Sequence, residues 1–171
     1  RRVAESRVLS DGTEIELTAA AYAYERSPLM ERVTKTVTAA GSGQEQTSVE
    51  ETYGEAAAYP YAAGQTKFTR DIAGVETFYD YEAAAEHGAA HKKTAVTKVG
   101  GELAAGQSRK TESFLAANDT VLVEQESVWD GDNWLLLSSG AHEYDEEGRR
   151  TKTTPGQRPR HLHVLDVLRQ A

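Results

Sequence analysis

The chain has 171 residues, of which 39% are hydrophobic, and its formal net charge at pH 7 is -8. This negative charge disfavours a nucleic-acid groove or an anionic membrane surface as partner, because both are bound by clustered Lys and Arg. The absence of cysteine excludes disulfides, thiolate metal sites and cysteine nucleophiles. With three Phe, two Trp and one Met, large core residues are scarce, so we expect a thin sheet with one face exposed to solvent.

Alternation of polar and apolar residues, broken by turn signals, runs through the first half of the chain. Asp11-Gly12 lies between alternating segments and predicts a hairpin turn, because both central residues of a type I′ turn need a positive φ. Strands are expected at 32–38 and 47–53. Residues 54–64 are expected to form an irregular loop or an edge, since Pro60 has no backbone donor for a ladder.

The second half of the chain shows the same pattern with more closely spaced turns. A second irregular stretch is expected at 82–90. Even turn spacing over many short strands predicts an all-β, largely antiparallel meander of hairpins, and polar residues on both strand faces favour a twisted open sheet over a sandwich. We assign residues 1–154 to this β region and 155–171 to a basic C-terminal tail, linker or short helix. The expected strands are 67–70, 75–81, 91–99, 108–115, 120–129, 134–144 and one beginning at 149.

The most specific local pattern lies near the C-terminus, where a strand ends in Tyr144 and Asp145 opens a tight turn. Asp side chains accept hydrogen bonds from backbone amides of such turns, and Gly148 supplies a positive φ where the turn closes. Arg149 then begins a basic, Thr-rich strand. Asp71 and Gly74 repeat the Asp-x-x-Gly spacing. These residues are expected to have conformational roles.

This order of Tyr-Asp, two variable residues, Gly-Arg and an alternating strand resembles the YD repeat of the RHS family. Tyr144, Asp145, Gly148 and Arg149 match the motif in order. The partial copy at 71–74 has no Tyr directly before its Asp and has Val75 in place of Arg, and the segment 9–13 matches still less well. The specific motif covers about a tenth of the chain, whereas the regular succession of hairpins extends to residue 154.

The resemblance implies a β-ribbon that spirals into a shell. Such shells enclose a C-terminal toxin or face the extracellular medium in bacterial RHS proteins and related toxin-complex subunits, and teneurin YD repeats act in cell-surface recognition. We therefore expect a non-catalytic structural section of a larger exported bacterial protein, extracellular or at the cell surface. Its expected partners are neighbouring repeats or domains, with a toxin cargo or a surface glycan as further candidates. The start at Arg1-Arg2-Val3, without Met, is consistent with a section of a longer protein.

No metal or cofactor site is expected from the sequence. His87 and His91 would share a face of a helix, as zinc ligands do, but Gly88 argues against a helix there. Solvated or packing roles are the favoured interpretation for all five histidines. The segment 130–134 has some character of a calcium loop, but it lacks the Gly and Glu of the EF-hand pattern, so a hairpin turn is expected. The five histidines are His87, His91, His142, His161 and His163.

No catalytic residue is assigned. The chain contains no Gly-x-Ser-x-Gly elbow, no P-loop and no Gly-x-Gly-x-x-Gly, so we expect it not to be an enzyme. The alternative function is a cell-surface carbohydrate- or protein-binding β-module with ligand-stacking aromatic residues, against which stands the interpretation that the same rings form the small core. These candidate stacking residues are Tyr59, Tyr61, Trp129 and Trp134.

Overall fold

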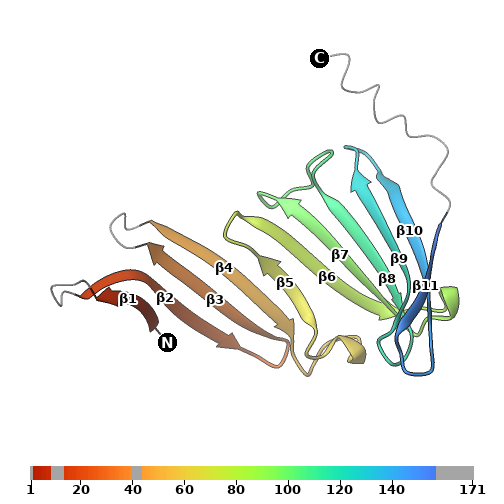
Figure 1. Cartoon of the computed structure of the whole chain (residues 1–171), viewed down its shortest axis with the longest axis horizontal. Coiled ribbons are helices and arrows are strands. Elements are labelled where there is room, and N and C mark those ends of the chain that lie inside the picture. The colour runs from red at the N-terminus through yellow and green to blue at the C-terminus, as the bar shows by residue number, and fades with distance from the viewer. Residues whose placement is uncertain (1, 9–13, 40–43, 157–171) are drawn as a thin grey trace, which may run out of the picture.

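The computed structural model describes residues 2–8, 14–39 and 44–156, with side chains for 19–38 and 44–156. Within these residues eleven strands form one sheet in sequential order, and every neighbouring pair is antiparallel. The prediction of an all-β antiparallel meander in an open sheet is confirmed (Figure 1). The strands are β1 (Arg2–Val8), β2 (Glu14–Arg26), β3 (Met30–Ala39), β4 (Glu45–Tyr53), β5 (Thr66–Arg70), β6 (Val75–Ala83), β7 (His91–Val99), β8 (Arg109–Leu115), β9 (Val121–Trp129), β10 (Trp134–Tyr144) and β11 (Arg150–Pro155).

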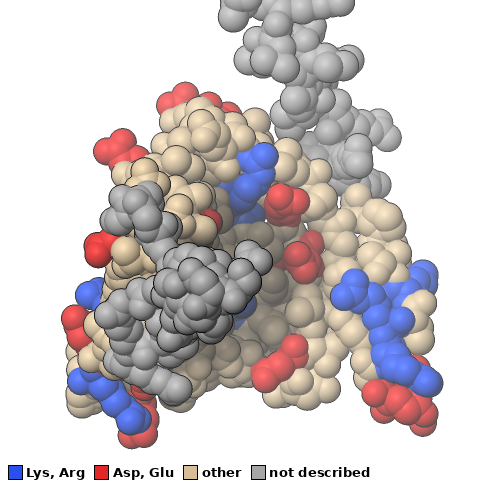
Figure 2. Space-filling model, turned by 60° about the vertical axis from the view of Figure 1, so that its left-hand side comes forward, with Lys and Arg blue, Asp and Glu red and all other residues tan. Residues whose placement is uncertain are grey.

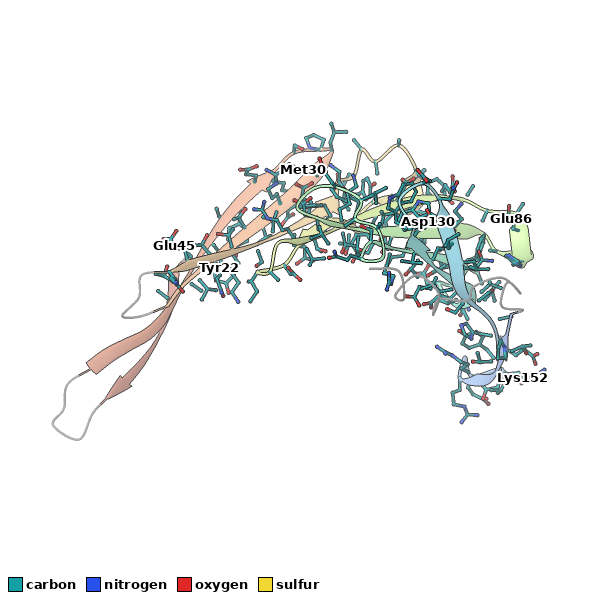
Figure 3. All side chains as sticks on the ribbon, turned by 90° about the horizontal axis from the view of Figure 1, so that it is seen from above. Tyr22, Met30, Glu45, Glu86, Asp130 and Lys152 are labelled. Carbon is teal, nitrogen blue, oxygen red and sulfur yellow. The ribbon has the colours of Figure 1, made fainter. Side chains whose placement is uncertain are left out.

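The sheet bends into an arch when it is seen from above, and its two ends curve toward the same side (Figure 3). Strand twist accumulates across many antiparallel neighbours and produces such bending when no second layer holds the sheet flat. Strand β11 continues to Pro155, one residue beyond the expected end of the β region. The expected Asp11-Gly12 turn and the remainder of the expected tail, residues 157–171, lie outside the described residues.

The strand β2 extends well beyond the alternation that indicates it in the sequence. Its second half is rich in Ala, a residue with weak β preference, and only Tyr22 and Tyr24 in it favour a strand. Its pairing with β3 is nevertheless unbroken from Thr18 opposite Ala39 to Arg26 opposite Glu31. Ladder pairing with a strongly alternating neighbour therefore decides the structure here, and the turn at Ser27 closes the hairpin, where its amide donates to the Met30 carbonyl at 2.8 Å.

Short 3-10 turns occupy the two stretches expected to be irregular. The turn η1 (Pro60–Ala62) lies between β4 and β5, and η2 (Glu86–Gly88) lies between β6 and β7. The loop that carries η2 packs on the sheet, where Ala89 joins Phe114 and Val123 in a small hydrophobic cluster. Both loops lie toward the same end of the strands (Figure 1).

Burial is sparse across the described side chains. Seven hydrophobic residues are buried, and three of them are Ala. All six residues of β11 are exposed. Among the described residues no helix is both long enough and apolar enough to span a bilayer. The buried hydrophobic residues are Ala19, Ala62, Tyr81, Ala89, Phe114, Leu115 and Val123.

Candidate functional site

The turn between β10 and β11 contains the Tyr-Asp-x-x-Gly-Arg pattern and is built around Asp145. The Asp145 amide donates to the Arg149 carbonyl at 3.0 Å, and the Gly148 amide donates to the Asp145 carbonyl at 3.0 Å. Gly148 has a φ of +77°, as expected for the last residue of a type I turn with a bulge. The Asp145 Oδ1 atom accepts from the amides of Glu147 at 3.1 Å and Arg149 at 2.8 Å.

The turn between β5 and β6 has the same geometry around Asp71. The Asp71 amide donates to the Val75 carbonyl at 3.0 Å, and the Gly74 amide donates to the Asp71 carbonyl at 3.1 Å. Gly74 has a φ of +82°. The Asp71 Oδ1 atom accepts from the amides of Ala73 and Val75, both at 2.9 Å. The partial copy, although it lacks Tyr and Arg, therefore forms the same turn.

A third turn of this kind joins β8 to β9 and was not predicted as a copy. The Ala116 amide donates to the Thr120 carbonyl at 2.8 Å, and the Asp119 amide donates to the Ala116 carbonyl at 3.0 Å. Asp119 takes the place of Gly with a φ of +65°, which Asp tolerates better than most residues. The sequence signal was hidden because the first position is Ala and the acceptor side chain belongs to Asn118, whose Oδ1 accepts from Thr120 at 3.3 Å.

Two side chains of the motif stabilise the β10–β11 turn. Tyr144 contacts the start of β9, and Arg149 contacts carboxylates within the turn. The Tyr144 hydroxyl donates to the Val121 carbonyl at 2.7 Å. The Arg149 guanidinium donates through Nε to Asp145 Oδ2 at 2.7 Å and through its terminal nitrogen to Glu147 at 2.9 Å. Backbone and side-chain hydrogen bonds from Arg149 hold the pKa of Asp145 below its usual value.

The four expected stacking aromatics lie in two separate places. Trp129 and Trp134 face each other across the β9–β10 turn, with ring centroids 5.3 Å apart. Tyr59 and Tyr61 belong to the η1 loop, toward the opposite end of the strands. The structure therefore brings each pair together but does not combine them into one surface.

Tyr59 and Tyr61 pack against their neighbours around His91. The Tyr61 ring is stacked on His91 with centroids 3.7 Å apart, and its hydroxyl donates to Asp119 Oδ1 at 2.7 Å. The Tyr59 hydroxyl lies 2.6 Å from His91 Nδ1. Burial, together with the Asp119 hydrogen bond, raises the pKa of Tyr61 to about 12, and burial raises the pKa of Tyr81, beneath it, to about 12. The contacts attach the η1 loop to β6, β7 and the β8–β9 turn.

His87, His142 and the Asp130 turn have local partners. His87 lies edge-on to Phe114 at 4.7 Å, and His142 Nδ1 lies 3.1 Å from the Thr153 hydroxyl. Asp130 Oδ1 accepts from the amides of Asp132 at 2.8 Å and Asn133 at 2.7 Å, which lowers the Asp130 pKa. Within the part of the chain that the structure describes, no three His, Asp or Glu side chains gather as a metal site. His161 and His163 lie outside it.

A hollow of about 580 Å³ lies over β3 to β6, and its lining includes none of the four aromatics expected to stack on a ligand. It combines basic, acidic and aromatic side chains from four strands. Figure 2 shows a hollowed face with Lys or Arg atoms inside and Asp or Glu atoms beside them. The lining residues that carry charge or rings are Arg32, Glu51, Tyr53, Lys67, Phe68, Arg70, Glu76, Phe78 and Tyr79.

Comparison of the chain with protein-family models, with curated proteins and with solved structures found no match. The resemblance to the RHS family therefore remains a prediction from residues 144–149 and their partial copy.

Proposed function

We propose that the chain is a non-catalytic structural section of an RHS-like shell, part of a larger exported bacterial protein that is extracellular or at the cell surface. The observation that carries this proposal is the recurrence of one turn geometry. Asp145, Asp71 and Ala116 each begin a turn with the same two backbone hydrogen bonds, in a sheet whose strands follow one another without a crossover. A ribbon of repeated hairpins is the architecture that a repeat-built wall needs.

The sparse burial supports a role that depends on neighbours. A single layer of antiparallel strands cannot bury much apolar surface by itself, and packing or edge pairing with other segments would complete it. The expected partners are accordingly neighbouring repeats or domains of the same protein, and an enclosed toxin is a further one.

The free edge of β11 is suited to such pairing. The Gly156 amide points inward and donates to the Ser139 carbonyl at 2.6 Å. Because successive amides of a strand alternate in direction, the nitrogens of Pro155 and Thr153 point away from β10. Pro155 can be accommodated there because its missing donor lies on the free side, while Thr153 offers an outward amide to an added strand.

Hydrogen exchange tests the proposal by comparing the isolated 171-residue chain with the intact polypeptide from its source. We expect the outward amide of Thr153 to exchange rapidly in the isolated chain and to be protected in the intact protein. Thr153→Pro removes that donor and keeps the backbone hydrogen bonds to β10, although it also removes the hydroxyl that lies 3.1 Å from His142 Nδ1. It is expected to leave the isolated chain folded and to make the intact protein sensitive to protease.

Thr153→Ala is the matched control, because it removes the same hydroxyl beside His142 but keeps the outward amide. It is expected to preserve both protection and protease resistance. Equally rapid exchange of Thr153 in the isolated chain and in the intact protein would contradict the structural role.

A second candidate, a cell-surface carbohydrate-binding module, is favoured by the hollow over β3 to β6. Its lining differs from the four aromatics expected from the sequence, since it contains Phe68 and Phe78 with basic residues around them. Binding of a ligand in this hollow is independent of the shell role.

A further inference from the structure

The hollow over β3 to β6 is built by cross-strand register. Arg32 lies opposite Glu51, Glu51 opposite Phe68, and Phe68 opposite Phe78 on four successive strands. A second row runs from Val49 through Arg70 to Glu76. Opposed residues of neighbouring strands point to the same face, so the two rows line one surface.

One half of this surface is an internally compensated charge cluster. Glu51 is 6% exposed, and one of its oxygens accepts from Arg32 Nε at 2.7 Å while the other lies 3.5 Å from Lys67 Nζ. Arg32 also lies 3.6 Å from the exposed Glu25. The hydrogen bond to Glu51 raises the Arg32 pKa, and both carboxylate oxygens of Glu51 are engaged within this cluster. It forms a fixed wall rather than a free anion site.

The other half carries cations that are not neutralised in the same way. Arg70 and Lys98 form no ion pair with any described residue, although Glu76 lies between them in the register. The Lys98 Nζ atom lies 4.8 Å from the centroid of the Phe78 ring. Phe78 is 40% exposed and packs at 5.0 Å against Phe68. Lys98 therefore lies over the accessible Phe78 ring at the rim of the hollow, and Arg70 lines the same hollow, in a chain whose net charge is -8.

We propose that this hollow binds an acidic oligosaccharide, a sugar chain that carries carboxylate or sulfate groups. Arg70 and Lys98 bind the acidic group, the Phe78 ring packs against the apolar face of a sugar ring, and the Glu76 carboxylate accepts from a sugar hydroxyl. An extended acidic peptide would also satisfy the cations, but it needs neither the exposed ring nor the carboxylate acceptor. The exposed Phe78 ring and the Glu76 carboxylate, together with the two cations, therefore favour a saccharide over a peptide.

Titration of the full chain with a galacturonic acid hexamer and with a heparin hexasaccharide, followed by NMR and calorimetry, tests the proposal. At least one of them is expected to bind and to shift the amide signals of β5 to β7, and which one binds distinguishes carboxylate from sulfate. Maltohexaose, a neutral hexamer, is expected not to bind. Raising the salt concentration is expected to weaken binding, because the Arg70 and Lys98 contacts are ionic.

Arg70→Gln and Phe78→Ala are each expected to weaken binding about tenfold, since each removes a charge-assisted or ring contact. Lys35→Gln is the matched control, because it also removes one positive charge but lies on the opposite face of β3, with its Nζ 5.9 Å from the Tyr22 ring. It is expected to change affinity less than about twofold. The dispersion of amide signals in each variant shows that it remains folded, and Arg70→Gln keeps the test valid if Phe78→Ala unfolds.

Three outcomes would overturn the proposal. They are failure of both acidic hexasaccharides to bind, equal weakening by Lys35→Gln and Arg70→Gln, and binding of a hexaglutamate peptide as tightly as the saccharides. Each of these results is independent of whether the Thr153 amide is protected in the intact protein, so the ligand and the structural role are tested separately.

Discussion

Two regions of the same sheet are stabilised in different ways. In the covered region, β6 to β9 with the η1 and η2 loops, eight residues are buried, including Tyr81, Phe114 and Leu115. In the bare region, the described part of β2 to β4, the buried residues are Ala19 and Glu51. The two regions differ in their loops, because a single sheet layer gains an apolar core only where a loop folds back over it.

The bare region relies on pairs between neighbouring strands. The hydroxyls of Thr36 and Thr47 lie 3.3 Å apart, and Arg32 joins Glu51 across β3 and β4. Such pairs contribute about 0.2–1 kcal/mol each, against about 3 kcal/mol or more for a large buried ring. The ladder therefore sets the geometry of the bare region, whereas the loops set the stability of the covered one.

The largest effect is expected from Phe114→Ala, which empties the centre of the hydrophobic cluster. Phe114 is 4% exposed and touches His87 and Ala89. We expect the free energy of unfolding to fall by about 3 kcal/mol, from lost burial and the cavity that remains. Chemical denaturation measures the loss. Val49→Ala, in the bare region, is the control, and an equal loss in the two variants would remove the distinction between the regions.

Gly54→Ala is expected to have the next largest effect, because this residue joins the β4–β5 loop to the β2–β3 turn. Its amide donates to the Leu29 carbonyl at 2.9 Å, and an added Cβ would overlap the Pro28 carbonyl. The backbone must move, at a cost of about 1–3 kcal/mol in the free energy of unfolding. At Gly140 the nearest atom to an added Cβ is 3.6 Å away, so Gly140→Ala is the matched control. Similar unfolding midpoints for both variants would contradict the close approach.

Much of the sheet could be predicted from the sequence, because turn residues act locally. Asp145 and Asp71 bond amides within four residues, so their turns were found from spacing alone. The second half of β2 was missed because its Ala residues become a strand through pairing with β3. The turn at 116–120 was not recognised as a copy, because Asp119 provides the positive φ in place of Gly.

The hollow could not be found from the sequence, since its residues meet only through register. Phe68 and Phe78 come from neighbouring strands, and Arg32 comes from a strand much earlier in the chain. The register also shifts between Glu51 and Thr52, so that Lys67 is skipped in the pairing of β4 with β5. No alternation pattern specifies such a shift.

A smaller effect is expected from Tyr61→Phe, which weakens the attachment of one loop that covers the sheet. The variant keeps the ring stacked on His91 but loses the 2.7 Å hydrogen bond to Asp119. We expect a loss of about 1 kcal/mol and faster hydrogen exchange in η1 and the β8–β9 turn. Tyr24→Phe, at a ring that is 61% exposed in the bare region, is the control and should change neither quantity. Unchanged exchange in η1 would show that stacking alone holds the loop.

The smallest effect is expected from acid at the β10–β11 turn, which no loop covers. Hydrogen bonds from Arg149 lower the pKa of Asp145 in the folded chain. The resulting stabilisation is fully present above the pKa of an unfolded Asp, and it is lost as the pH falls through the lower, folded value. Carbon NMR titration of the Asp145 carboxyl should therefore give a lower midpoint in the folded chain than in a peptide of residues 140–155.

The signals of β11 should change over the same acidic range while those of β7 stay constant, because the edge hairpin can fray without the covered region. Asp145→Asn keeps an oxygen acceptor for the turn but removes the titration, so β11 should then lose this pH dependence. A pH dependence of the β11 signals that persists in Asp145→Asn would contradict the assignment to the Asp145 carboxylate. In that case the ion pairs of Lys152 with Glu143 and of Arg149 with Glu147, rather than the turn carboxylate, would hold the edge strand β11 in place.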